Sequence, residues 1–208
     1  MNVLEKFGVV PIDIPALVTL MGDYKYPNDK VSKMEDNGEL IRLKKGLYVV
    51  APSVLQMPIS KELIANHLYG PSYVSFENAL SFYNLIPERV HNIRSLTLKR
   101  ARNFSTPIGN FEYISAHKDY FEIGIRQENV NDRYAYLIAS PEKALCDMIY
   151  ATPRLRLQSV KAMQVYLEDD LRIDFSAVDT FDTEIIRQCM VTGRKKTELT
   201  QLYNLLKQ

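Results

Sequence analysis

Three cations lie close together at one glycine-containing turn of the sequence. Arg42, Lys44 and Lys45 fall within the stretch Leu-Ile-Arg-Leu-Lys-Lys-Gly, and cations at an exposed turn are well suited to contact the phosphates of nucleic acids. Between residues 25 and 50 the chain carries six Lys or Arg and four Asp or Glu, which leaves a net charge of +2 (6 − 4). The positive charge is therefore local and mild. On the alternative interpretation, Lys44 and Lys45 merely solubilise a turn.

A second cationic group, Lys99, Arg100 and Arg102, lies where a predicted strand gives way to a loop. Such a group would extend a DNA contact or meet an acidic surface on a partner protein. A solvated loop would explain the same residues. The two cationic groups are more than fifty residues apart, so the sequence does not say whether they act together.

Enzyme motifs are missing from the sequence. It contains no Gly-x-Ser-x-Gly, no phosphate-binding loop ending in Gly-Lys-Ser/Thr, no His-Glu-x-x-His and no Cys-x-x-Cys. The histidines, His67, His91 and His117, are scattered and have no motif partner. The acids of residues 168–170 are consecutive, so on a helix they spread over different faces and indicate a solvated helix end. We therefore predict a protein with no catalytic site, metal or cofactor.

The first cationic turn belongs to a short run of predicted elements that would position it. Apolar residues recur at helical spacing over residues 14–21 and again over 28–37. Two strands, 40–43 and 47–50, then flank the Lys-Lys-Gly turn and predict a tight hairpin. Helix, turn, helix and hairpin is the order of a winged helix-turn-helix, whose second helix enters the major groove of DNA. Small helix-hairpin units also serve as structural or protein-binding modules.

The rest of the chain predicts a second domain. Strands are expected at 93–98, 109–115 and 133–139, and they would form a small, mostly antiparallel sheet. The expected helices are 60–70, 75–85, 140–150, 158–168, 182–191 and 196–206. We therefore predict an α+β protein with a winged helix-turn-helix domain at residues 1–55 and an α+β domain with a helical C-terminal region at residues 56–208.

Composition and charge restrict the class of protein. With 46% hydrophobic and 25% charged residues, the 208-residue chain has the composition of a globular protein rather than a disordered one. Its net charge of +1 provides no overall field toward nucleic acid or membranes, so such binding needs a local patch. The two cysteines, Cys146 and Cys189, lie among apolar residues and are expected in the core. A basic, apolar leader and a membrane span are not evident, so we expect a cytoplasmic protein.

Several segments resemble one family of regulators. Tyr24–Lys33 and Gly38–Tyr48 are similar to the winged helix of the AbiEi antitoxin family, the transcriptional-regulator half of type IV toxin-antitoxin and phage abortive-infection systems. The resemblance to the second domain of that family continues through Tyr73–Glu88, Val90–Lys99, Gly109–Tyr113 and Ser140–Leu145. Together these segments cover roughly residues 1–150, and their order carries more weight than any single motif.

The resemblance implies a bacterial repressor that binds inverted repeats upstream of its own operon and counters a nucleotidyltransferase-like toxin. It also assigns DNA-binding residues by position. Those facing the groove would be Asn28, Lys30, Ser32 and Lys33, and those on phosphate would be Arg42, Lys44 and Lys45. The acidic residues Asp29 and Asp36 on the same outward face argue against strong binding.

Two other functions fit the same sequence. In the first, the chain is a free-standing winged-helix regulator whose second domain senses a ligand or dimerises. In the second, the N-terminal unit never touches DNA and the protein is an interaction module.

Overall fold

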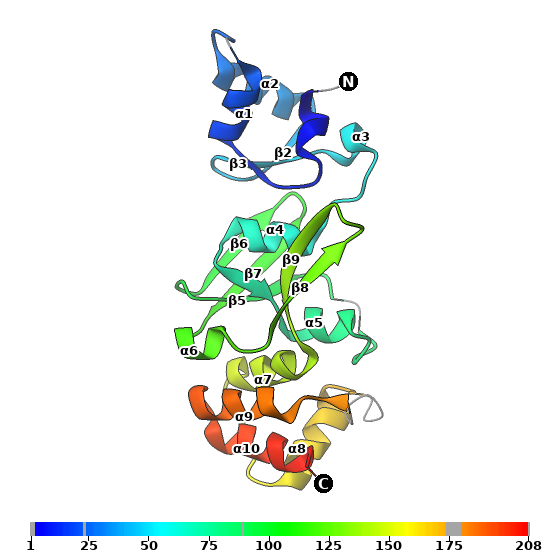
Figure 1. Cartoon of the computed structure of the whole chain (residues 1–208), viewed down its shortest axis with the longest axis vertical. Coiled ribbons are helices and arrows are strands. Elements are labelled where there is room, and N and C mark those ends of the chain that lie inside the picture. Colours follow the sequence, from blue (N-terminus) through cyan, green and yellow to red (C-terminus); the bar gives the residue numbers. More distant parts are fainter. Residues whose placement is uncertain (1–2, 23, 89, 174–179, 208) are drawn as a thin grey trace.

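The structure is a computed structural model that describes residues 3–22, 24–88, 90–173 and 180–207. The molecule is elongated, with its two ends far apart (Figure 1). An N-terminal module of helices and a small sheet lies at one end, a larger sheet lies in the middle, and a group of helices lies at the other end. The predicted α+β class is confirmed.

The N-terminal module follows the predicted succession of two helices and a hairpin. A 3-10 helix and a short strand that were not predicted precede them. Its elements are η1 (Val3–Phe7), β1 (Ile12–Asp13), α1 (Ile14–Met21), α2 (Pro27–Asp36), β2 (Leu40–Lys44), β3 (Leu47–Val50) and α3 (Pro52–Leu55). Asp13 caps α1 by accepting a hydrogen bond from the Ala16 amide at 2.9 Å. Gly46, with φ of 80°, forms the hairpin turn because glycine adopts positive φ without strain.

The small sheet of this module, in the order β1-β3-β2, contributes apolar side chains to a core on each of its faces. Tyr48 and Val50 face α1 and α2, where they pack with Val31 of α2. Val49 and Leu43 face the opposite way and belong to the core of the rest of the chain. This alternation follows from the two-residue period of a strand. The N-terminal module therefore packs directly on the second part of the chain.

The central sheet is larger than predicted. It contains the three expected strands, β5 (Ile93–Thr97), β7 (Gly109–Ser115) and β9 (Tyr134–Ala139), and three more, β4 (Ser72–Val74), β6 (Arg102–Thr106) and β8 (Ile125–Val130). The order is β6-β7-β5-β4-β9-β8, and the pairs β4-β9 and β5-β7 are parallel, so the sheet is mixed. The missed strands are short or polar and lie at its edges or between buried neighbours, where pairing rather than side-chain pattern determines the strand.

Helices cover this sheet and form the far end of the molecule. They are α4 (Lys61–Leu68), α5 (Phe76–Phe82), α6 (Lys118–Phe121), α7 (Pro141–Ala151), α8 (Val160–Val165), the π-helix η2 (Tyr166–Asp170), α9 (Thr183–Thr192) and α10 (Lys196–Leu205). Figure 1 shows α7 between the sheet and the pair α9 and α10. The predicted C-terminal helices are confirmed. As expected, Cys146 and Cys189 are buried.

A buried ion pair attaches α7 to the sheet. Lys143 and Asp147 are both fully buried, and the lysine Nζ donates to an aspartate oxygen at 2.7 Å. The other oxygen of Asp147 accepts from the Ser75 hydroxyl at 2.6 Å and the Tyr73 hydroxyl at 3.1 Å. Every member of this network has a partner, which buried charges require. The segment Ser140–Leu145 that carried part of the family resemblance is thus the buried start of a core helix.

Among the helices of the described residues, none combines the length and the apolar character needed to cross a membrane.

Candidate nucleic-acid interface

Helix α2 has one buried face and one outward face. Val31 and Met34 pack into the core of the N-terminal module, since they are three residues apart on a helix. Of the residues assigned to a DNA groove, Asn28, Ser32 and Lys33 are exposed and Lys30 is half-buried. The acidic residues Asp29 and Asp36 are exposed as well. The outward face of α2 is therefore polar and of mixed charge.

Arg42 on β2 is already paired within the module. Its guanidinium donates to the Glu35 carboxylate at the end of α2 and lies 5.6 Å from the ring centre of Tyr48. The pKa of Arg42 is raised, first by the neighbouring Tyr48 and then by the hydrogen bond and charge of Glu35. Its positive charge is thus partly balanced before any phosphate arrives.

Lys44, at the end of β2, is directed at the second part of the chain instead of at solvent. Its ammonium group donates a hydrogen bond to the main-chain carbonyl of Leu68, the last residue of α4. A cation at a helix C-terminus is favourable because unpaired carbonyls give that end a partial negative charge. Lys44 was predicted to contact phosphate, and in the structure it holds the hairpin against α4. Lys45, the next residue, is exposed.

The structure brings Lys44 together with the second cationic group of the sequence. Lys44, Lys99 and Arg102 surround the rings of Tyr69 and Phe104, and we call these five residues the basic cluster. The Arg102 guanidinium lies 4.8 Å from the ring centre of Phe104, and the Lys99 ammonium lies 5.1 Å from that of Tyr69. The ammonium of Lys44 lies 6.0 Å from the Phe104 ring centre. Cations over aromatic faces are attracted by the ring quadrupole.

The charge of the basic cluster is not neutralised. Within the part of the chain that the structure describes, no carboxylate forms an ion pair with Lys44, Lys45, Lys99, Arg100 or Arg102. The pKa of Lys44 is lowered, mainly because burial removes water from its ammonium and then because Lys99 and Arg102 repel it. Converging, unpaired cations beside aromatic rings form a surface suited to the phosphates of nucleic acid.

No protein-family model and no curated protein matches this sequence. The family resemblance of residues 1–150 therefore stays a prediction, and the geometry carries the case for nucleic-acid binding.

The predicted DNA-binding residues form two separate surfaces. The outward face of α2 and the basic cluster lie on opposite sides of the three-stranded sheet, since one face of that sheet packs on α1 and α2 and the other on the rest of the chain (Figure 1). Arg42 is tied to α2, whereas Lys44 belongs to the basic cluster.

Two residues of the basic cluster were missed by sequence reasoning. Tyr69 is half-buried, and its hydroxyl donates to the Arg100 carbonyl at 3.2 Å. Phe104 was not singled out. The alternation of Arg102 and Phe104 on one strand would have placed them on the same face, had β6 been recognised as a strand.

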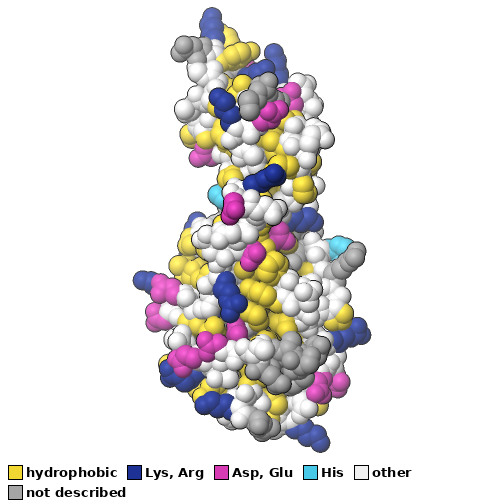
Figure 2. All heavy atoms as spheres, turned by 45° about the vertical axis from the view of Figure 1, so that its right-hand side comes forward, with side chains coloured by type: hydrophobic (Ala, Val, Ile, Leu, Met, Phe, Trp, Pro, Cys, Tyr) yellow, Lys and Arg dark blue, Asp and Glu magenta, His cyan; other side chains and the backbone are white. Residues whose placement is uncertain are grey.

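One face of the molecule carries side chains of both charges. Figure 2 shows a face on which Lys and Arg alternate with Asp and Glu, and a narrow waist below the N-terminal module. A net charge of +1 attracts polyanions only weakly, so any electrostatic attraction of a polyanion to this protein depends on a local group of cations such as the basic cluster. The described residues contain no group of three or more His, Cys, Asp and Glu placed to hold a metal ion.

Proposed function

We propose that this chain is a DNA-binding transcriptional autorepressor and the antitoxin of a type IV toxin-antitoxin system, acting in the cytoplasm against a nucleotidyltransferase-like toxin. The observation that carries the DNA-binding part is the convergence of Lys44, Lys99 and Arg102 beside the hairpin that follows α2, none of which forms an ion pair with a described carboxylate. Proteins obtain much of their affinity for DNA from such contacts with phosphate.

The order of elements supports a winged helix-turn-helix. Two helices precede a hairpin, and the second helix presents Asn28, Ser32 and Lys33 outward, where side chains of these types hydrogen-bond to base edges or phosphates. In this proposal α2 enters the major groove of an inverted repeat, and two copies of the chain occupy its half-sites. The basic cluster then meets phosphates beyond the groove, so that both parts of the chain contact DNA.

The antitoxin part rests on the resemblance of residues 1–150. We propose a binding role rather than catalysis, because the sequence carries none of the catalytic motifs named above and His67, His91 and His117 have no motif partner. Growth of cells that express the neighbouring reading frame, with and without this protein, tests the role. Relief of growth arrest is expected. Absence of arrest, or arrest that this protein cannot relieve, would favour a DNA-binding regulator that is not an antitoxin.

The DNA-binding proposal is tested by replacing two exposed residues of α2. Ser32→Ala with Lys33→Ala should weaken binding to DNA from upstream of its own gene and reduce the slope of log K against log salt by about 0.9, for one lost phosphate contact. The fold should be unaffected, because both side chains are exposed. Fluorescence anisotropy at several salt concentrations measures the slope. Lys161→Ala, an exposed lysine on α8, is the matched control.

Full-length variants are needed for these experiments. Val9, Leu43 and Val49 of the N-terminal module belong to the main core, so a truncated chain that begins after residue 55 would expose apolar surface. One observation favours the rival role as an interaction module, namely that Lys44 at the hairpin is held by the Leu68 carbonyl. Unchanged anisotropy of all tested DNA with the intact chain would support that rival.

A further inference from the structure

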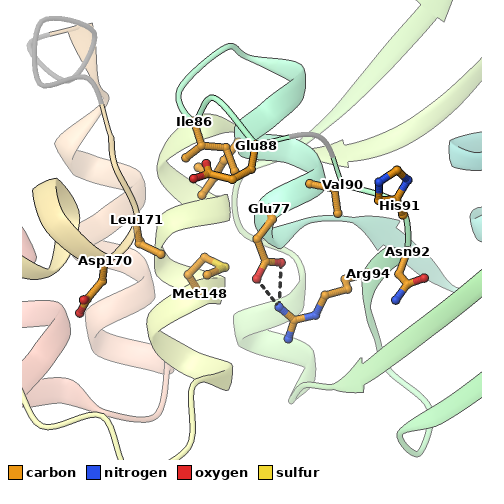
Figure 3. A pocket seen from close by; sticks show the side chains of 11 residues that line it. Glu77, Ile86, Glu88, Val90, His91, Asn92, Arg94, Met148, Asp170 and Leu171 are labelled. Atoms are coloured by element: carbon orange, nitrogen blue, oxygen red, sulfur yellow. Dashed lines mark hydrogen bonds and ion pairs between the residues drawn. The ribbon is translucent and has the colours of Figure 1, made fainter.

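A pocket of about 500 Å³ lies on the second part of the chain, away from the basic cluster. Figure 3 shows it between α5, the segment that leads into β5, helix α7 and the end of η2. Apolar side chains line its interior: Leu80, Ile86, Met148 and Leu171. A pocket with apolar walls and a few polar groups at its edge is the usual form of a small-molecule site.

Arg94 lines this pocket and is paired with two carboxylates. Its guanidinium donates through Nη1 to both carboxylate oxygens of Glu77, at 2.8 and 2.7 Å, and through Nε to Glu112 at 3.0 Å. It also lies 4.4 Å from the ring centre of Phe76. Figure 3 shows Glu77 and Arg94 directed toward each other. Arg94 therefore has little capacity left to attract an anion.

Among the described residues that line the pocket, carboxylates outnumber guanidinium groups. Glu77, Glu88 and Asp170 line it together with Arg94, and Glu112 and Arg172 form ion pairs with two of these lining residues. Glu88 pairs with Arg172 only loosely, at 3.4 Å, and both are largely exposed. Asp170 at the end of η2 forms no ion pair with the described residues. The edge of the pocket thus favours a cation.

We propose that this pocket binds a linear aliphatic diamine or polyamine. Such a molecule places ammonium groups at the ends of a methylene chain, and the pocket places carboxylates at its edge and apolar side chains inside it. The methylene groups would lie against Met148 and Leu171, and one ammonium group would reach Glu88. The other would reach Asp170 after a change of rotamer, since Figure 3 shows the Asp170 carboxylate directed away from Met148. A bare metal ion fits less well, since no three ligand side chains of the described chain converge.

Isothermal titration calorimetry of the full-length protein with putrescine and spermidine tests the proposal. Saturable binding is expected, with spermidine tighter than putrescine because it carries one more charge. Succinate, with the same number of carbons as putrescine but negative ends, should not bind. Glu88→Gln with Asp170→Asn should weaken the binding of spermidine by about two- to thirtyfold, for two surface ion pairs.

The matched control is Glu122→Gln, which removes an exposed carboxylate beside α6 and outside the pocket and should leave the affinity unchanged. Both pocket substitutions are at exposed positions, and circular dichroism checks that the variants fold. Absence of saturable spermidine binding to the wild-type protein would overturn the proposal. Equal affinity of the double variant and the wild type would also overturn it, because the binding would then occur elsewhere.

Discussion

Replacing both Lys99 and Arg102 by glutamine should weaken DNA binding and leave the fold intact. Both side chains are exposed and lack ion pairs with the described residues, so their removal leaves no buried charge. The loss of their contacts with Tyr69 and Phe104 costs about 0.5–1 kcal/mol for each exposed cation-aromatic pair. Relief of their repulsion on Lys44 returns roughly 0.2–1 kcal/mol per pair. At the middle of these ranges, three cation-aromatic pairs cost about 2 kcal/mol and two relieved repulsions return about 1 kcal/mol, so the free energy of unfolding should fall by about 1 kcal/mol.

DNA binding by the same variant should change much more. If each cation meets one phosphate, two contacts are lost, and the slope of log K against log salt falls by about 1.8 (2 × 0.9). Fluorescence anisotropy across a salt series gives the slope, and urea unfolding gives the stability. The control is Lys118→Gln with Lys161→Gln, which removes the same charge from exposed positions on α6 and α8.

Two results would refute this reasoning. An unchanged slope would mean that the basic cluster does not contact DNA. A loss of stability well above 2 kcal/mol, a magnitude typical of a disrupted buried network, would mean that these cations have a structural role instead.

Three further predictions concern stability, each measured by urea or thermal unfolding. Lys44→Met should destabilise the protein by roughly 1–2 kcal/mol, because it removes a charged hydrogen bond at the end of α4. Lys45→Met, at the exposed neighbouring position, should have almost no effect. Equal effects of the two substitutions would contradict the docking of the hairpin on α4. Asp147→Asn should cost roughly 3–5 kcal/mol, since it leaves the buried ammonium of Lys143 without a counter-charge, and a near-neutral result would contradict the buried ion pair. The pKa of Glu184 is lowered from 4.5 to about 2, mainly by its hydrogen bond to Arg187, one helical turn later. The ionised carboxylate of Glu184 therefore stabilises the folded protein above pH 4.5, and this contribution is lost as the pH falls toward 2. Glu184→Gln should reduce the loss of stability over that interval, and an unchanged acid profile would show that the pair does not persist in solution.

Local features of the sequence predicted two helices and the hairpin of the N-terminal module. The helical spacing of residues 14–21 and 28–37 and the glycine turn at Gly46 correspond to α1, α2 and the β2-β3 hairpin. These features act over a few residues, through capping, side-chain period and glycine conformation, so the sequence displays them directly. The helices of the C-terminal region were predicted for the same reason.

Features that depend on pairing or on distant neighbours were not predicted. The polar strands β6 and β8 carry little pattern, and they are strands because β7 and β9 pair with them. Lys143 and Asp147 are i, i+4 on a helix, which from sequence alone indicates an exposed pair. Both are buried, because α7 lies between the sheet and α9.

The sequence by itself determined the α+β class, the helix-helix-hairpin succession and the residues that make up each of the two cationic groups. Only the tertiary structure decided that Lys44 and Arg102 share one surface, and that this surface lies across the small sheet from α2. The physical reason is that each face of that sheet contributes apolar side chains to a core. Leu43 and Val49 are drawn into the main core by the removal of their apolar surface from water, and the hairpin is thereby held against α4 and β6.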